Sequence, residues 1–221
     1  SLIKVPIMAC VYCAEKEGKL DIRQRVVIRN KNKTLGAGIL KYLPEGISFD
    51  IEELVHLMVA YSDNTATNIL IDLLGFDYLN SCFKNLGLKD TAIFRKILDN
   101  QARKEGKENY TTAQDIGYIL EMIYRKELIS KDISEKCLEY LRQQKMRDRI
   151  PAFLPSEVLV AHKTGLENGV CHDAGIIFSK EGDFLICVLT QHRFKTAGPS
   201  KHFIAEVSKR LYFAFNKKKD E

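Results

Sequence analysis

The chain opens with an apolar stretch that is almost unbroken. Residues 5–14 read VPIMACVYCA and contain no charged side chain. The proline, Pro6, falls in what would be the first turn of a helix, where backbone N–H groups have no intrahelical partner, so it does not break one. The pattern predicts a buried helix that starts at the first turn of the chain.

Apolar positions then recur at the helical period through the middle of the chain. Asp50 followed by Glu53 is typical of a capping box and predicts a helix over residues 51–61. The polar residues 62–64 interrupt the apolar pattern directly after it. Further helices are expected over residues 65–74, 76–86, 112–125 and 134–144.

Polar and glycine-containing stretches separate these helices. Residues 20–28 suggest a short extended piece, residues 29–38 a loop, and residues 46–49 a turn. Residues 97–110 lose the apolar period altogether. A polar loop of this length inside a compact domain is uncommon and often functional.

The last third of the chain has strand-like patterns. Residues 158–162 are short and apolar, which predicts a strand. Residues 170–179 and 184–191 are joined by a Lys-Glu-Gly-Asp turn and predict a hairpin. Residues 200–215 carry a stripe of apolar side chains at helical spacing and predict an amphipathic helix.

These elements predict an α+β fold over the whole chain, as one domain spanning residues 1–221. Residues 1–150 form its mainly helical part, and residues 151–221 form an antiparallel sheet covered by the C-terminal helix. The hydrophobic content of 45% and the charged content of 29% are those of a globular protein.

Charge and hydropathy exclude two classes of partner. The net charge of +5 is spread along the chain, and the basic run at 217–219 is interpreted as a solvated end. Basic residues do not cluster with stacking aromatics, so nucleic-acid binding is not expected. No run approaches the roughly 20 apolar residues of a membrane span, so no transmembrane segment is expected.

The cysteine pattern points away from a metal site. The six cysteines are Cys10, Cys13, Cys82, Cys137, Cys171 and Cys187. The first two form a C-x-x-C with no second pair and no nearby histidines, which argues against zinc. Most of the six lie in or beside apolar runs and are interpreted as small buried side chains, although a disulfide stays open. No metal and no cofactor are expected.

Three short polar signatures interrupt the apolar elements: Ser-x-x-Lys at residues 1–4, Ser-Asp-Asn at 62–64 and Lys-Thr-Gly at 163–165. A serine hydroxyl is a poor nucleophile until a base takes its proton. On a helix, Lys4 lies one turn from Ser1 on the same face. Burial of this helix would favour the neutral amine of Lys4, which makes Lys4 a candidate base for Ser1.

The second signature and the lysine of the third supply groups for proton transfer and charge. Ser62 could relay the proton to a leaving nitrogen, and Asn64 could offer its amide to the substrate and to Lys4. Lys163 could supply positive charge for a substrate carboxylate and lower the proton affinity of Ser62.

The rest of the third signature, which is expected to end a strand, suits substrate binding. Thr164 could donate a hydrogen bond to the substrate carboxylate, and Gly165 would let a ligand lie along the strand edge. The backbone N–H of Leu166, paired with that of Ser1, could form an oxyanion hole.

Taken together and in this order, the three signatures are those of class A β-lactamases and penicillin-binding proteins, a serine hydrolase family that this chain resembles over nearly its whole length. Residues 57–70 are very similar to the family's central helix pair, and residues 88–91 and 109–112 resemble the segments that bracket its Ω-loop. The resemblance implies a β-lactamase/transpeptidase-like fold and opening of a cyclic amide through a Ser1 acyl-enzyme. It also implies a small-molecule β-lactam or a peptidoglycan stem peptide as partner, and an extracytoplasmic location.

One departure from the family lies in the Ω-loop. Class A β-lactamases carry a glutamate there that activates the deacylating water. When Arg95 and Thr112 are aligned with their family counterparts, Ile97 occupies that position, and it cannot act as a base. The carboxylates nearby are Asp99, Glu105 and Glu108. Unless one of them substitutes, the acyl-enzyme should persist.

Two further departures concern the front of the chain and the substrate anchor. The family has a helix and two strands before its serine, whereas the given sequence begins at Ser1. We interpret the sequence as a shortened chain and expect the two N-terminal strands to be missing from its sheet. A rarer alternative is that Ser1 uses its own amine as base. Arg149 resembles one placement of the family's carboxylate-binding arginine, and a solvated surface arginine is the alternative.

Three functions therefore stay open. A β-lactamase-type hydrolase with slow deacylation ranks first because the overall resemblance is to class A. A penicillin-binding enzyme similar to D-Ala-D-Ala peptidases is the second. A β-lactam-sensing or binding domain that is acylated only once is the third, and Ile97 is the residue that separates the first function from the others.

Overall fold

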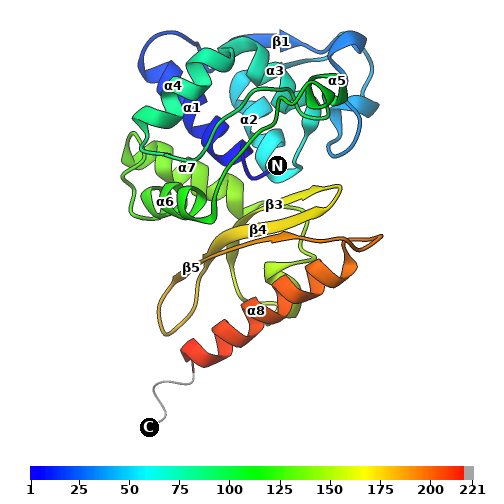
Figure 1. Ribbon diagram of the computed structural model, residues 1–221. Helices are drawn as coiled ribbons and strands as arrows, with labels where there is room; N and C mark the ends of the chain where they lie inside the picture. Colours follow the sequence, from blue (N-terminus) through cyan, green and yellow to red (C-terminus); the bar gives the residue numbers. More distant parts are fainter. Residues whose placement is uncertain (217–221) are drawn as a thin grey trace.

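The computed structural model describes residues 1–216, and the basic run at 217–219 lies outside the described residues. Helix α1 (Lys4–Lys16) runs through the middle of the helical part (Figure 1). Its side chains from Lys4 to Tyr12 are all buried, as the apolar pattern predicts. The helices packed around α1 are α2 (Ile51–Ala60), α3 (Asn64–Leu74), α4 (Phe76–Asn85) and α6 (Ala113–Tyr124).

Local capping explains where several of these helices begin. The carboxylate of Asp50 accepts from the backbone N–H of Glu53, and Glu53 returns a bond to the N–H of Asp50, which is the expected capping box of α2. Asp63 caps α3 through the N–H of Ala66. Helix α7 (Lys131–Arg142) begins three residues earlier than its apolar pattern predicts, because Ser130 caps it.

The segments between the helices contain small elements. Strands β1 (Arg25–Val27) and β2 (Ser48–Asp50) pair as a short antiparallel ribbon, so the predicted extended piece and turn are only partly correct. The loop expected at 97–110 holds one short helix, α5 (Asn100–Lys104). The short 3-10 helices are η1 (Asn30–Asn32), η2 (Leu40–Tyr42) and η3 (Ile150–Phe153).

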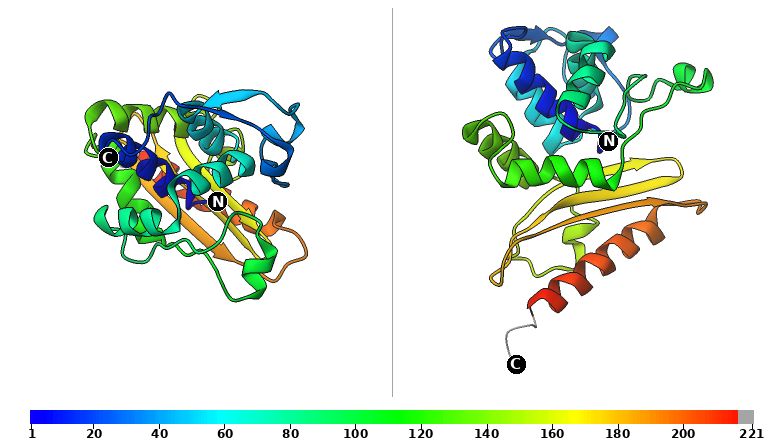
Figure 2. Two further views of the ribbon diagram at one scale, coloured as in Figure 1. Left: turned by 90° about the horizontal axis from the view of Figure 1, so that it is seen from above. Right: turned by 60° about the vertical axis from the view of Figure 1, so that its left-hand side comes forward.

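The last third forms an antiparallel sheet in the order β3 (Val160–Glu167), β4 (Val170–Ile177) and β5 (Phe184–Gln191). Helix α8 (Gly198–Asn216) covers one face, and α6, α7 and the helices above them cover the other (Figures 1 and 2). The α+β fold is therefore confirmed. Strand β3 starts later and runs further than the predicted strand at 158–162, so Lys-Thr-Gly lies within the strand rather than at its end.

Alternation along β3 decides which side chains meet the helical part. Ala161 belongs to the large hydrophobic core built around α1, whereas Val160 belongs to the smaller core beneath α8. Because successive side chains of a strand point to opposite faces, Lys163 shares the face of Ala161. The strand thus directs the lysine of the third signature toward the helices that carry the first two.

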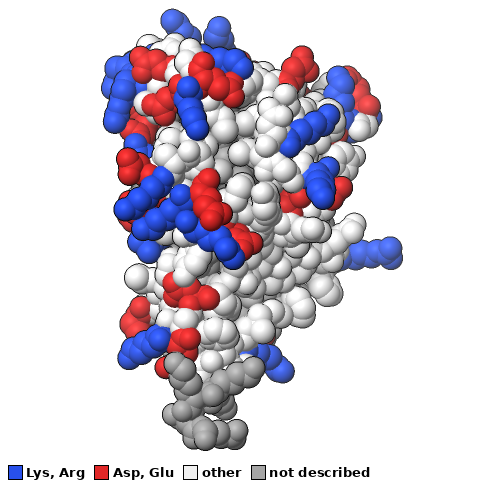
Figure 3. Space-filling view, turned by 90° about the vertical axis from the view of Figure 1, so that its left-hand side faces the viewer, with Lys and Arg blue, Asp and Glu red and all other residues white. Residues whose placement is uncertain are grey.

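The surface carries charges of both signs. Figure 3 shows acidic and basic side chains interspersed on one face of the molecule, with uncharged side chains between them. Among the described residues, none of the helices has both the length and the apolar character that crossing a membrane requires.

Close packing of β4 against β3 gives a test of the sheet beside the third signature. A Cβ added at Gly175 would lie 2.5 Å from the carbonyl oxygen of Ala161 and 2.5 Å from the Cβ of His162. We expect Gly175→Ala to reduce the free energy of unfolding by about 2–3 kcal/mol and to lower Tm by roughly 5–10 °C, measured by thermal denaturation.

The matched control is Gly117→Ala in α6, where the added Cβ would make only ordinary contacts from 3.6 Å. Alanine is the better helix former, so this variant should melt at or slightly above the wild-type temperature. Equal melting of Gly175→Ala and wild type would show that β4 is not as tightly packed as described.

Candidate functional site

Two buried lysine amines meet at one serine hydroxyl. The Nζ of Lys4 lies 3.1 Å from the Oγ of Ser62, and the Nζ of Lys163 lies 2.9 Å from the same oxygen. Lys4 and Lys163 are both fully buried. Helix α1, the α2–α3 connection and strand β3 therefore contribute one group each to a single point.

The amine of Lys4 has two further partners. It donates to the carbonyl oxygen of Ser62 at 2.6 Å and to the Oδ1 of Asn64 at 2.8 Å. Burial, followed by the charge of Lys163, holds the pKa of Lys4 well below its ordinary value, although Asp63 opposes the shift. An uncharged amine has two hydrogens for the two carbonyl oxygens and keeps its lone pair for a hydroxyl proton.

Lys163 is less strongly perturbed. Burial lowers the pKa of Lys163 to about 7, with the charge of Asp173 raising it and that of Arg149 lowering it. Its Nζ also donates to the carbonyl oxygen of Thr164 at 2.8 Å. Near neutral pH this amine is therefore divided between its charged and uncharged forms, and a bound carboxylate would favour the charged form.

The backbone of Ser62 is strained. Its φ is 54°, a left-handed conformation that is uncommon for residues other than glycine. The carboxylate of Asp63 fixes the chain next to it by accepting from the N–H groups of Ile39 at 2.6 Å and Leu40 at 2.9 Å. Gly38 allows this approach, because a Cβ there would lie 2.3 Å from the Asp63 carboxyl. Such strain persists where surrounding contacts over-determine the conformation, as they do here.

Ser1 lies next to this group. The backbone N–H of Lys4 donates to the carbonyl oxygen of Ser1 at 3.2 Å, which makes the two residues neighbours on one turn. Ser1 is therefore held at the same end of α1 at which the Lys4 amine binds Ser62 and Asn64.

A pocket of about 390 Å³ opens at Ser1. Asn64, Ile97, Glu108 and Leu166 also line it, so residues singled out from separate parts of the sequence border one cavity. Lys163 and Thr164, which are buried, lie in the strand segment just before Leu166. A Cβ at Gly165 would come within 3.2 Å of His172, so only a residue without a side chain fits here with ease.

The loop at 97–110 brings no free carboxylate to Ser1. The side-chain amide of Asn68 pins the backbone of Ile97, accepting from its N–H at 2.8 Å and donating to its carbonyl oxygen at 3.1 Å. Asp99 is used as the cap of α5, where it accepts from the N–H of Ala102. Glu105 is exposed and bonded to its neighbours Gln101 and Lys107.

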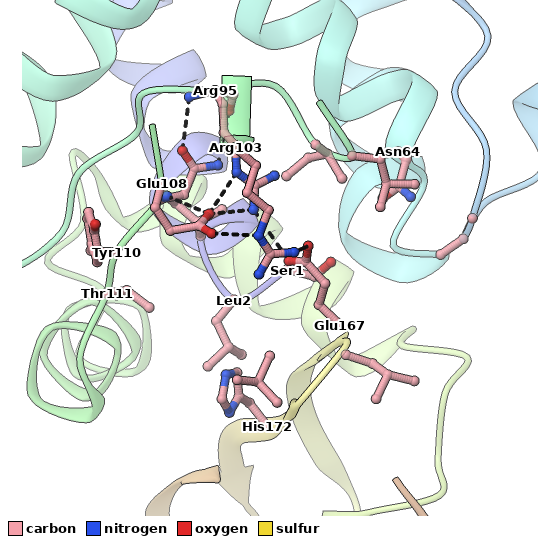
Figure 4. Close-up of a pocket in the computed structure, with 18 of the residues that line it drawn as sticks. Ser1, Leu2, Asn64, Arg95, Arg103, Glu108, Tyr110, Thr111, Glu167 and His172 are labelled. Atoms are coloured by element: carbon pink, nitrogen blue, oxygen red, sulfur yellow. Dashed lines mark hydrogen bonds and ion pairs between the residues drawn. The ribbon is translucent and has the colours of Figure 1, made fainter. Parts of the chain in front are cut away.

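Glu108 does line the pocket, but two arginines hold it (Figure 4). It accepts from the Nε of Arg95 at 2.7 Å and pairs with the Nε of Arg103 at 3.0 Å. Burial alone would raise the pKa of Glu108, but the Asn109 N–H and the two arginines outweigh it and hold the pKa below its usual value. This carboxylate is therefore a weaker proton acceptor than an unpaired glutamate.

The same arginines link the loop to the end of β3. Arg103 pairs with Glu167 at 2.6 Å, and Arg95 lies 3.5 Å from the other oxygen of Glu167. Figure 4 shows Arg103 between the two glutamates, with Glu167 beside Ser1. This four-residue charge network, made of Arg95, Arg103, Glu108 and Glu167, crosses one wall of the pocket.

Arg149 is buried, with only 2% of its surface exposed, so the alternative of a solvated surface arginine is wrong. Its Nε donates to the Sγ of Cys171 at 3.2 Å, and its Nη1 pairs with Asp148 at 2.9 Å. Behind Lys163, Asp173 accepts from the Nδ1 of His162 at 2.9 Å and from the N–H of Ile150 at 3.0 Å. Asp173 therefore ties β4 to β3 and to η3.

Several residues of the site were not found by sequence reasoning. Asp63 could have been recognised, because an aspartate directly before an apolar helix is a typical N-cap. The pairing of Arg103 with Glu167 joins residues 64 positions apart and had no local signal. His172, which was not counted among the catalytic residues, lines the pocket, and burial is the main cause that lowers its pKa.

Comparison with known proteins agrees with this fold and site. The sequence model of the β-lactamase enzyme family matches residues 1–215. The chain therefore belongs to the class A β-lactamase family and is a serine hydrolase of the β-lactamase type. It is 27% identical over 230 residues to the extended-spectrum β-lactamase PER-1 of Pseudomonas aeruginosa, covering 96% of this chain and 73% of PER-1.

Solved structures give the same family. A β-lactamase from Sphaerobacter thermophilus is similar with a TM-score of 0.88 and 29% identity, covering 97% of this chain and 81% of that one. The protein PBP-A is similar with a TM-score of 0.87 and 29% identity, covering 97% of this chain and 80% of that one. A leucine-to-glutamate variant of PBP-A was solved as an acyl-enzyme complex with penicillin G.

The pKa of Lys163 predicts how acylation depends on pH. Because this pKa is about 7, Lys163 loses, as pH rises above it, the positive charge that we expect it to offer a substrate carboxylate. The second-order rate constant for acylation by a fluorescent penicillin, followed from about pH 5 to about pH 10, should fall on the alkaline side by up to tenfold per pH unit.

Lys163→Arg is the matched variant, because a guanidinium keeps its charge throughout this range. In this variant the decline of the acylation rate constant on the alkaline side should move to higher pH, even if the rate constant itself differs from that of the wild type. An identical limb in wild type and Lys163→Arg would show that another group causes the decline.

Proposed function

We propose that this protein opens the amide of β-lactams through a covalent acyl-enzyme on Ser1. The observation that carries the proposal is the meeting of the Lys4 and Lys163 amines at the Ser62 hydroxyl beside Ser1. Nucleophilic serines need an adjacent base, and Lys4 is buried, has a lowered pKa and lies one helical turn away. Family membership supports the same chemistry.

In the proposed acylation step, the neutral amine of Lys4 takes the proton of the Ser1 hydroxyl as its oxygen attacks the lactam carbonyl. The negative charge that develops on the carbonyl oxygen would be stabilised by the backbone N–H groups of Ser1 and Leu166. Both residues line the pocket, which supports this assignment.

Collapse of the tetrahedral intermediate then requires a proton at the leaving nitrogen. The Ser62 hydroxyl accepts hydrogen bonds from Lys4 and Lys163, so it could give its proton to the leaving nitrogen. Lys4 would then pass the proton that it took from Ser1 to the Ser62 oxygen. In this step Lys163 and the hydroxyl of Thr164 would hold the substrate carboxylate, and Asn64 would offer its amide to the substrate. Arg149 adds positive charge behind Lys163 rather than a direct contact, because other groups hold its guanidinium.

Deacylation is proposed to be slow. A hydrolytic water needs a base near the acyl carbonyl, and Ile97 occupies the position where class A enzymes place a glutamate. The remaining carboxylates of the loop cap a helix, face solvent or pair with arginines. The acyl-enzyme should therefore accumulate during turnover.

A second candidate is a penicillin-binding enzyme that acts on D-Ala-D-Ala stem peptides and that β-lactams inhibit. Ile97 favours it, as does the similarity to PBP-A. A sensing domain that is acylated once would share the slow deacylation. An extracytoplasmic location, where peptidoglycan and β-lactams are encountered, and a single domain over residues 1–221 are part of the proposal.

Labelling tests the nucleophile. A fluorescent penicillin should form a covalent adduct with the wild-type protein, and mass spectrometry of the digested protein should place it on Ser1. Ser1→Ala should lose the adduct completely, because no other hydroxyl next to a lysine base lines the pocket in the described part of the chain. If Ser1→Ala labels as well as wild type, the assignment of Ser1 is wrong.

The missing base gives a second test. Ile97→Glu would place a carboxylate on a backbone that Asn68 already fixes, so deacylation should become faster by on the order of 10–100-fold. The measurement is the decay of the penicilloyl-enzyme by mass spectrometry, together with nitrocefin turnover. Ile97→Gln has the same length but no base and should decay at the wild-type rate.

Fast wild-type turnover without accumulation of acyl-enzyme would contradict slow deacylation. An effect of equal size in Ile97→Glu and Ile97→Gln would also contradict it, because it would show that polarity rather than basicity matters at this position.

A further inference from the structure

A histidine and an aspartate pair on the face of the sheet that α8 and η3 cover. His162 on β3 and Asp173 on β4 are both fully buried. The Nδ1 of His162 lies 2.9 Å from one carboxylate oxygen of Asp173 and 3.0 Å from the other. None of the chemical steps proposed above involves this histidine.

The pair lies beside the third signature. His162 and Thr164 are two positions apart on β3 and therefore share one face of the sheet, and Asp173 is directly opposite Thr164 on β4. The Cβ atoms of directly opposite residues in an antiparallel pair are about 4.5–5.5 Å apart, so a threonine hydroxyl and an aspartate carboxylate can reach each other there. Asp173 thus has two side chains on β3 that could donate to it.

The carboxylate of Asp173 is bound to His162 and leaves Thr164 alone. Its second donor is the backbone N–H of Ile150, at 3.0 Å. Within residues 1–216, no other group donates to this carboxylate, and no lysine or arginine forms an ion pair with it. In the same part of the chain, Lys163 bonds to the carbonyl oxygen of Thr164, and the threonine hydroxyl makes no hydrogen bond. That hydroxyl is therefore available to a ligand.

The second ring nitrogen of His162 has no role of its own. Nε2 is buried and has no hydrogen-bond partner among the described residues. A carboxylate only accepts hydrogen bonds, so the nitrogen that faces Asp173 carries the proton and Nε2 keeps a lone pair. With one nitrogen bonded and the other idle, the ring cannot pass a proton between two groups. Its contact with Asp173 is what it contributes.

We propose that His162 is a positioning residue for substrate binding: by holding Asp173, it leaves the hydroxyl of Thr164 free to donate to the carboxylate of a β-lactam. Without the imidazole, the carboxylate would keep only the Ile150 N–H, and a buried charged acceptor left unsatisfied is costly. The hydroxyl of Thr164, directly opposite, would then turn to Asp173 and be lost to the substrate. The inference rests on the function proposed above and concerns how that site recognises its substrate.

The experiment compares acylation by a penicillin with acylation by its methyl ester, which lacks the anionic carboxylate. His162→Leu removes the donor, and the second-order rate constant for the free acid should fall about tenfold while that for the ester stays within about twofold. His162→Asn is the matched control, because asparagine has the shape of leucine and places an amide N–H close to the position of Nδ1. It should keep both rate constants near those of the wild type.

A double-mutant cycle identifies the group through which His162 acts. In Thr164→Val the hydroxyl is already absent, so adding His162→Leu should cause no further loss of preference for the acid over the ester. A further loss of the same size in this background would overturn the proposal, because His162 would then act on another group. An equal fall for acid and ester in His162→Leu would also overturn it, because a merely structural role gives that result.

One measurement needs neither a variant that folds nor any acylation. Nitrogen NMR of the histidine rings in the wild-type protein should show the proton of His162 on Nδ1 and none on Nε2. A proton on Nε2 alone would overturn the inference and leave the proposed function standing, because His162 could not then donate to Asp173. A wild-type protein that has the expected tautomer but forms no penicillin adduct would instead overturn the proposed function, and this inference with it.

Discussion

The structure depends on two lysine amines that share one hydroxyl in a dry interior. Two full positive charges at this separation would repel strongly where water cannot screen them, so the fold can hold Lys4 and Lys163 only by lowering their pKa values. The polar oxygens around Ser62 accept their hydrogens. The same burial that makes the site costly to fold favours the uncharged amine of Lys4, so the cost in stability and the proposed reactivity have one physical cause.

That cost varies with pH in a defined direction. In the unfolded chain both amines titrate near their ordinary value of 10.5, whereas in the folded protein Lys163 titrates at about 7 and Lys4 well below 10.5. Between these limits the unfolded state binds more protons, so this contribution makes the protein more stable as pH rises from about 7 toward 10.5. Below the folded values both states are protonated and the penalty is complete. The strained backbone of Ser62 adds to this cost in stability. The Asp63 carboxylate offsets part of the cost by accepting hydrogen bonds from three backbone N–H groups.

The helices, the sheet and the three signatures could be predicted from the sequence, because each depends on the spacing of nearby residues. The signals were a capping box before α2, apolar residues at the helical period, and short polar motifs within apolar runs. Sequence reasoning failed where tertiary contacts decide. Lys-Thr-Gly lies inside β3 because pairing with β4 continues through Lys163 to Glu167, which no property of the local residues shows. Arg149 is buried because η3 packs beneath the sheet, and its charge gave no hint of that. The link from Arg103 to Glu167 depends on how a loop folds over a strand end.

The loop shows why counting carboxylates does not reveal a catalytic base. Asp99, Glu105 and Glu108 all lie within the segment that should hold one, but each already has partners, and the only one of them that borders the pocket is bound by two arginines. For Glu108 to act as the base, Arg95 and Arg103 would have to give up their contact with it. The two guanidinium groups would then lose a negatively charged partner in the partly buried wall of the pocket, which is unfavourable. Glu167 holds both arginines from the other side and so opposes this rearrangement. The charge network therefore supports the slow deacylation proposed above independently of Ile97, because it keeps Glu108 and Glu167 paired with arginines.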